Sequence, residues 1–201
     1  MRVLARLYEK LWIHWWPELY GWCWLRWYQW LYGIQVGKRV RCWGRIELAK
    51  SAESTITIGD DVRIASDSLR CGVALWSRCR LQAFGRGEIH IGHGVAISGG
   101  SFTCRSTRID IAQGAMIGPN VTIVDSDFHA IRSRDRRTDL GYDADRPVVI
   151  GKNAWIGMQS LVLKGVTIGE NTVVAARSVV TTSLPANVVA GGHPARVLSA
   201  L

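Results

Sequence analysis

The C-terminal half of the chain carries an aliphatic residue at every sixth position. The strictest run is Ile150, Ile156, Val162, Ile168, Val174 and Val180. A period of six fits neither the 3.6-residue turn of an α-helix nor the strict alternation of a long strand. It fits a short flat strand followed by a corner, repeated, so that stacked coils line up their aliphatic residues as one apolar ladder. The period predicts a triangular parallel β-helix with three hexapeptides per coil, without indicating its hand.

The first 34 residues follow a different compositional rule. Seven of the ten tryptophans lie in this segment. From Leu4 apolar residues recur at the spacing of one helix face, and Pro17 ends or kinks that helix. A second segment, residues 18–32, is aromatic nearly all round. We therefore expect two parts, a Trp-rich amphipathic helical segment over 1–34 and a β-helix domain over 35–201.

The Trp-rich segment has the composition of a membrane-surface helix. Titratable side chains interrupt every window long enough to span a bilayer, at Glu9, Lys10, His14, Glu18 and Arg26. Trp and Tyr prefer the headgroup level, where the ring is half apolar and its N–H or O–H still reaches water. We expect the segment to lie on the inner face of the cell membrane, and we expect no cleaved signal peptide. The alternative is that its aromatic face packs on the body of the protein or on a sister subunit.

The net charge of +9 raises nucleic acid as a possible partner. The arginines are scattered, however, and the chain has no aromatic RNA-binding signature and no zinc-finger spacing. A basic surface also suits an anionic membrane or a phosphate-bearing cofactor. The five cysteines include no C-x-x-C pair, so neither a disulfide framework nor a zinc site is supported. We expect no nucleic-acid partner, no bound metal and a cytoplasmic protein with reduced thiols.

The six-residue period stops between Ile123 and Val148. The insert over 125–147 is polar and begins Asp-Ser-Asp-Phe-His. An insert in so regular a scaffold must leave the ladder as a loop, and loops on rigid scaffolds are where catalytic groups collect. We therefore expect the functional site to include this loop.

Four segments of the repeat region carry more specific motifs. They are Val-Ile-Gly-Lys-Asn-Ala-Trp-Ile-Gly at 149–157, Leu-Lys-Gly-Val-Thr-Ile-Gly at 163–169, Ala-Arg-Ser-Val-Val-Thr at 176–181 and Gly-His-Pro-Ala-Arg at 192–196. With these motifs the chain, over roughly 56–198, resembles the hexapeptide-repeat acyltransferases, in particular the sugar and polysaccharide branch with galactoside, maltose and lipopolysaccharide O-acetyltransferases. The resemblance implies a left-handed β-helix, a homotrimer and an active site between neighbouring subunits.

The resemblance also implies chemical roles around the loop. His129 matches the family's catalytic histidine and would take the proton of a sugar hydroxyl as that oxygen attacks the acetyl-CoA thioester. A carboxylate on the other ring nitrogen would hold the tautomer, and either Asp127 or Asp125 could supply it. The backbone N–H near Met158 would stabilise the thioester oxygen.

Acetyl-CoA itself is expected along the C-terminal coils. The implied contacts are Trp155, Met158, Ala176, Thr181, Thr182 and Arg196. Ser98 is expected beside the acceptor sugar. Galactoside-type enzymes carry Asn where Ser98 stands and Lys where Thr182 stands, which weakens any transfer of acceptor specificity and removes one phosphate contact.

The sequence is also compatible with two other functions. The related γ-class carbonic anhydrases share the β-helix and bind zinc through three histidines, for which His90, His93 and His129 are the candidates. A non-catalytic platform for a surface-polysaccharide assembly is the second. The Ala-Arg-Ser and Gly-x-Pro-Ala motifs and an intact His129 favour the transferase. We therefore predict an acetyl-CoA-dependent O-acetyltransferase acting on a lipid-linked glycan or a surface-polysaccharide precursor.

Overall fold

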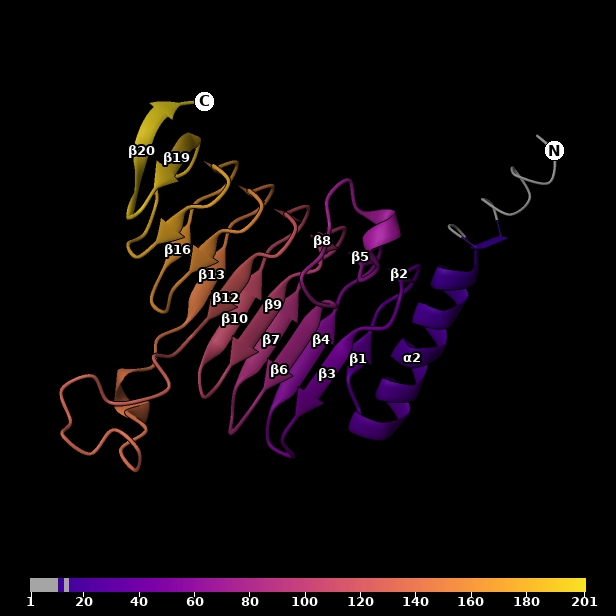
Figure 1. Cartoon of the computed structure of the whole chain (residues 1–201), viewed down its shortest axis with the longest axis horizontal. Coiled ribbons are helices and arrows are strands. Elements are labelled where there is room, and N and C mark those ends of the chain that lie inside the picture. Colours follow the sequence, from indigo (N-terminus) through magenta and orange to yellow (C-terminus); the bar gives the residue numbers. More distant parts are fainter. Residues whose placement is uncertain (1–10, 13–14) are drawn as a thin grey trace.

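The body of the protein is a three-sided stack of short strands with one helix across its N-terminal end (Figure 1). This computed structural model describes residues 11–12 and 15–201, so the helix expected from Leu4 falls almost wholly outside the described residues. The chain visits three sheets in turn, and every neighbouring pair of strands is parallel except the last, β19 with β20. These sheets confirm the parallel hexapeptide-repeat architecture predicted from the period.

From β1 to β18, every third strand belongs to the same sheet. Sheet A contains β1 (Gln35–Val36), β4 (Thr55–Ile58), β7 (Glu88–Ile91), β10 (Arg108–Ile111), β13 (Val148–Ile150) and β16 (Thr167–Ile168). Sheet B contains β2 (Arg41–Trp43), β5 (Arg63–Ala65), β8 (Ala96–Ser98), β11 (Met116–Ile117), β14 (Trp155–Ile156), β17 (Val173–Val174), β19 (Val188–Gly192) and β20 (Ala195–Ala200). Sheet C contains β3 (Glu47–Lys50), β6 (Arg80–Ala83), β9 (Ser101–Cys104), β12 (Thr122–Val124), β15 (Leu161–Val162) and β18 (Val179–Val180).

The aliphatic residues of the six-residue period form the core. The pairs in register are Ile150 with Ile168, Ile156 with Val174, and Val162 with Val180. All six side chains are fully buried. One hexapeptide therefore advances the chain by one sheet, and three return it to the same sheet one coil further on.

The corners of the stack explain the small residues that follow the aliphatic ones. A Cβ added at Gly157 would lie 2.5 Å from the amide nitrogen of Ala176 in the next coil. That contact is too short for any side chain, so only glycine fits at this corner. Asparagines at other corners adopt positive φ, as at Asn153 and Asn171. Their side chains also bond along the stack, with Asn153 Nδ2 donating to Asn171 Oδ1 at 2.8 Å.

Helix α2 (Trp16–Tyr32) covers the open end of the first coil. Pro17 lies in its first turn, where a missing N–H costs nothing, and Gly33 ends it in the left-handed conformation. The helix packs closely, because a Cβ at Gly21 would lie 2.2 Å from the Cys42 carbonyl oxygen. Its inner face buries Leu25 and Tyr28, whose hydroxyl donates to the Ile46 carbonyl. Among the described residues, none of the helices combines the length and hydropathy that a membrane span requires.

Two segments interrupt the stack. One, over 66–79, includes the short 3₁₀ helix η2 (Ser68–Arg70) and lies beside sheet B. The other, over 125–147, includes η3 (Tyr142–Ala144) and connects sheet C to sheet A. The second is the loop that the break in the period predicted.

Candidate active site

The loop over 125–147 begins at a fully buried carboxylate. Asp125 is 0 % exposed and accepts hydrogen bonds from the backbone N–H groups of Arg105, Ser106 and Thr107 at 2.7, 3.1 and 2.9 Å. The Thr107 hydroxyl also donates to it. Asp125 thereby ties the first residue of the loop to the turn between β9 and β10 in the preceding coil.

Arg105, on that same turn, holds both ends of the loop. Its guanidinium forms a two-pronged ion pair with Asp145, Nε to Oδ2 at 2.9 Å and Nη2 to Oδ1 at 2.6 Å. Nη1 donates to the carbonyl oxygens of Phe128 and Leu140. The guanidinium also lies over the Tyr142 ring, 4.2 Å from its centroid. The side chains of Arg105 and Asp145 are 7 % and 1 % exposed, so this pair is a buried clamp on the loop.

Asp145 stays ionised in this setting. Burial by itself would raise the pKa of its carboxyl, but hydrogen bonds from Arg105, Ser106 and Ser126 outweigh burial and hold the pKa below its ordinary 3.8. A charged carboxylate at this position is what keeps the buried guanidinium compensated.

His129 is the residue after Phe128, whose carbonyl oxygen accepts a hydrogen bond from Arg105. The residue before it, Phe128, has a positive φ of 66°, a conformation uncommon in aromatic residues. The His129 ring is exposed, and its Nδ1 lies 2.5 Å from the Arg136 carbonyl oxygen. A carbonyl oxygen can only accept, so Nδ1 carries the proton and Nε2 of the neutral ring is left free to accept one. The loop's own backbone therefore fixes the tautomer that a general base needs.

Neither aspartate named for that orienting role is bonded to the ring in this structure. Asp125 is occupied by the turn at 105–107. Asp127 pairs with the Lys164 ammonium at 2.5 Å. Lys164 in turn donates to the Ala144 carbonyl, which links the start of the loop to its end. Both aspartates stabilise the loop, and the group at Nδ1 is the backbone of Arg136.

An apolar groove runs along the edge of sheet B. It has a volume of about 520 Å³. Its lining includes Trp155, Met158 and Ala176, three of the residues expected to contact the donor. It is also lined by Gly118 and Pro119 from the preceding coil and by Gly72 and Val73 from the segment over 66–79. Trp155 remains 49 % exposed, so its ring is available to a ligand.

The other residues expected at the donor and acceptor lie around this groove without lining it. Thr181 and Thr182 are exposed directly after β18, and Arg196 is exposed on β20. Ser98 lies at the end of β8, hydrogen-bonded to the Cys71 thiol. Cys71 immediately precedes Gly72 in the groove lining, so Ser98 is close to one wall.

Groove and loop occupy different long edges of the stack. The groove lies where β11, β14 and β17 end and the chain turns toward sheet C. The loop leaves at the next corner, between β12 of sheet C and β13 of sheet A. In Figure 1 the loop extends to the lower left of the stack, while β2, β5 and β8 of sheet B lie on its upper right side. Within one chain, the loop that carries His129 and the groove thus leave the stack at different corners.

The three candidate zinc histidines are also separated. His90 lies on β7 with Nε2 3.1 Å from Glu88 Oε2, and His93 lies 3.5 Å from Asp61 Oδ2. Within the described part of one chain, no group of three or more His, Cys, Asp or Glu side chains is placed to hold a metal ion.

Two functional features were not predicted from the sequence. The Arg105–Asp145 clamp joins residues 40 positions apart, and nothing in the local pattern of either indicates the other. Gly72 and Val73 belong to a second break in the period, after Ala65, and that break was the available signal.

Comparison with known proteins gives one consistent answer. Residues 147–182 match the family model described as "Bacterial transferase hexapeptide (six repeats)". The chain is 38 % identical over 114 residues to a galactoside O-acetyltransferase of Lactococcus lactis subsp. lactis (strain IL1403), covering 57 % of this chain and 54 % of the relative. It is 32 % identical over 125 residues to the putative lipopolysaccharide biosynthesis O-acetyl transferase WbbJ of Escherichia coli (strain K12), covering 59 % and 64 %.

The fold gives the same result. The crystal structure of a maltose O-acetyltransferase from Clostridium difficile 630 matches with a TM-score of 0.53 and 27 % sequence identity, covering 83 % of this chain and 69 % of that one. The chain spans about half to two thirds of the length of these curated relatives. In its repeat, its three-sheet stack and these similarities, the chain resembles the hexapeptide-repeat transferases, whose family model it matches over residues 147–182.

Proposed function

We propose that the protein is an O-acetyltransferase that moves the acetyl group of acetyl-CoA to a sugar hydroxyl, with His129 as general base. The observation that carries the proposal is the groove at sheet B, which gathers Trp155, Met158 and Ala176 beside the family's repeat. Relatives named as galactoside and lipopolysaccharide O-acetyltransferases support the reaction class. We further propose that the acceptor is a lipid-linked glycan or a surface-polysaccharide precursor.

The apolar lining of the groove suits the donor, acetyl-CoA. Glycines and short aliphatic side chains give an apolar groove that can accommodate a pantetheine arm. Met158 would act through its backbone N–H on the thioester oxygen, so its side chain matters little. Thr181 and Thr182 would contact the donor beyond the groove, and Arg196 would meet its phosphates.

The tautomer of His129 suits the role of general base. Its Nδ1 proton is donated to the Arg136 carbonyl, so Nε2 can take the proton of the attacking hydroxyl. The resulting imidazolium can then protonate the departing CoA thiolate, which returns the ring to its starting state.

The separation of loop and groove favours a site shared between copies. We propose a homotrimer of left-handed β-helices in which the loop of one subunit reaches the groove of its neighbour. The apolar groove and the projecting loop lie at adjacent corners of a three-sided stack, so a ring of three copies can bring the loop of one subunit to the groove of the next.

The test is release of free CoA from acetyl-CoA in the presence of a soluble galactoside or a membrane glycolipid extract. Wild type is compared with His129→Ala, and His93→Ala serves as the matched control because that histidine is also exposed but lies outside the loop. Loss of release only in His129→Ala is expected, by about 10² to 10⁴-fold. Absent release with every acceptor would favour the platform, and bound zinc in the purified protein would favour the anhydrase.

A further inference from the structure

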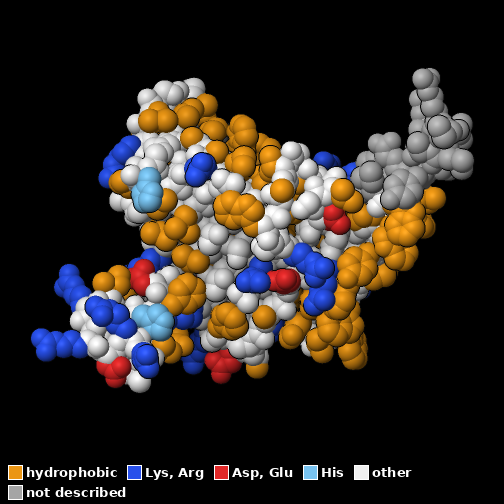
Figure 2. Space-filling model, in the orientation of Figure 1, with side chains coloured by type: hydrophobic (Ala, Val, Ile, Leu, Met, Phe, Trp, Pro, Cys, Tyr) orange, Lys and Arg blue, Asp and Glu red, His pale blue; other side chains and the backbone are white. Residues whose placement is uncertain are grey.

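The outer face of α2 is an aromatic stripe that the body of the protein leaves uncovered. The outer stripe consists of Trp16, Leu19, Cys23, Trp27 and Trp30. All five are exposed, Trp30 by 80 %. Figure 2 shows hydrophobic side chains along the whole outer side of this helix. Since a second stripe of α2 is already buried against the first coil, the helix is apolar on both sides and its outer side fits a further apolar partner.

From this face we infer that α2 docks the protein on a lipid bilayer, with its axis along the surface and the outer stripe in the headgroup layer. The inference goes beyond the acetyl transfer proposed above and does not depend on it. Interfacial helices of this kind carry aromatic side chains on the lipid side and basic groups around them.

The hydrogen-bonding needs of the stripe favour lipid over a second copy of the chain. An indole N–H can only donate, and none of the five side chains in the stripe carries an oxygen. If two copies met stripe to stripe, each buried indole would lack a side-chain acceptor on the opposing stripe. The headgroup layer supplies phosphate, ester and water oxygens at the depth where Trp rings lie.

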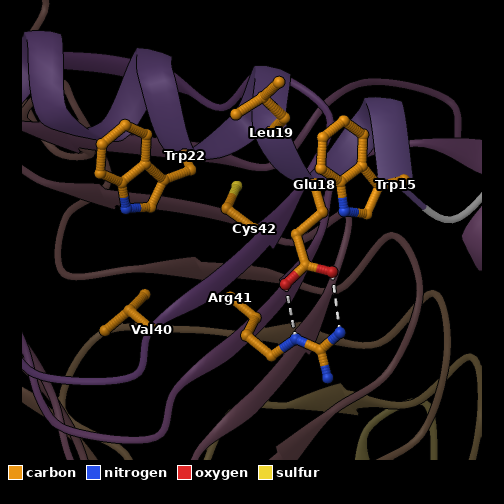
Figure 3. A pocket seen from close by; sticks show the side chains of 7 residues that line it. All are labelled: Trp15, Glu18, Leu19, Trp22, Val40, Arg41 and Cys42. Carbon is orange, nitrogen blue, oxygen red and sulfur yellow. Dashed lines mark hydrogen bonds and ion pairs between the residues drawn. The ribbon is translucent and has the colours of Figure 1, made fainter.

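The charges around the stripe fit an anionic surface. α2 has two charged side chains, Glu18 and Arg26. Both oxygens of Glu18 accept from Arg41 at 2.7 Å, which neutralises the acidic group (Figure 3). Figure 3 also shows Trp15, Leu19 and Trp22 lining a hollow beside this pair. Arg26 remains next to the stripe, with its guanidinium 5.6 Å from the Trp22 ring centroid. Attraction to anionic headgroups is therefore expected.

Docking through α2 also sets how far the loop lies from the lipid. Helix α2 covers the end at which β1 begins sheet A, and the loop precedes β13, four strands further along that sheet. At about 4.8 Å per strand the loop root lies roughly 19 Å from the covered end. If the proposed transferase activity holds, the sugar that it acetylates is a residue well along a glycan rather than the one attached to lipid.

The experiment is flotation of the full chain with vesicles of phosphatidylcholine alone and of phosphatidylcholine with about one quarter phosphatidylglycerol. The double variant Trp27→Ser/Trp30→Ser is compared with Trp76→Ser, because Trp76 is 73 % exposed but lies on the segment over 66–79. Wild type should float with vesicles, more strongly with phosphatidylglycerol. The double variant should bind at least about tenfold more weakly, and Trp76→Ser should match wild type.

Quenching of Trp fluorescence by brominated lipids gives an independent readout, and it should be strong in wild type and weak in the double variant. Wild type that floats with neither vesicle would overturn the inference. So would a double variant that floats like wild type, or one whose assembly state in lipid-free buffer changes, since that would make the stripe a contact between copies. Acetyl transfer to a soluble acceptor should be equal in all three proteins, so a failure of docking and a failure of catalysis give different results.

Discussion

The loop over 125–147 and helix α2 are both additions to the same regular stack, yet they are attached by opposite means. The loop is held by buried charges with directed bonds, Arg105 to Asp145 and Asp125 to the turn at 105–107. The helix is held by apolar packing around Gly21 and Leu25, and its ion pair of Glu18 with Arg41 is only partly buried. Directed bonds can fix the position of a single catalytic side chain to within fractions of an ångström. Apolar packing instead fixes which face of the helix is turned outward.

The largest effect is expected for Arg105→Met, which removes the clamp on the loop. Losing one partner of a buried ion pair costs about 3–5 kcal/mol of unfolding free energy, because Asp145 is left charged and uncompensated. The kcat of acetyl transfer should fall by more than about tenfold with little change in the KM for acetyl-CoA, because the clamp holds His129 and not the groove. Chemical denaturation and steady-state kinetics check both.

Arg39→Met is the matched control for that variant. Arg39 forms the same two-pronged pair with Asp61, at 2.6 Å for both bonds, but on the surface. Its loss should change neither stability nor kcat measurably. Equal effects of the two substitutions would show that the clamp is no more than another ion pair.

The packing of the helix is broken most cleanly by Gly21→Ala. The added methyl group would overlap the Cys42 and Gly44 carbonyl oxygens, at 2.2 and 2.7 Å. The helix must shift, at a cost of about 1–3 kcal/mol. Because α2 is remote from the loop, kcat on a soluble acceptor should be unchanged while vesicle binding weakens. A fall in kcat of the size seen for Arg105→Met would contradict the division of roles.

Acid should destabilise the loop by protonating Asp145. The pKa of Asp145 is held below 3.8 in the folded chain, so its contribution to stability is complete above pH 3.8 and is lost as pH falls through the lower folded value. Wild type should therefore lose stability steeply below pH 3.8, and Asp145→Asn should lack that part of the slope. Unfolding free energies measured over this range test it. Parallel curves would show that the clamp does not depend on ionised Asp145.

The smallest effect is expected for Glu18→Gln in α2. Glu18 and Arg41 are 31 % and 52 % exposed, so their pair contributes under about 1 kcal/mol. The substitution leaves the apolar packing intact and makes the helix face more basic. Thermal unfolding should change little, and binding to anionic vesicles should be equal or stronger.

The same contrast explains what could be predicted from the sequence. The period identified the core positions, because a repeated pattern reports a repeated environment, and the break in it identified the loop. It did not indicate which group orients His129, because the Arg136 carbonyl is a backbone atom brought near by the loop's own path. The sequence also did not indicate which face of α2 is buried against the first coil. A helix that is aromatic nearly all round has no polar face that would have to remain in water.

Mass analysis of the acceptor after incubation with acetyl-CoA, comparing wild type with His129→Ala, tests the proposed acetyl transfer. Detection of acetylated sugar also separates transfer from simple thioester hydrolysis. We predict acetylated sugar with wild type and almost none with His129→Ala, while both proteins bind acetyl-CoA equally. Product formed equally by both proteins, or CoA released by wild type with no acetyl group on any acceptor, would contradict the account.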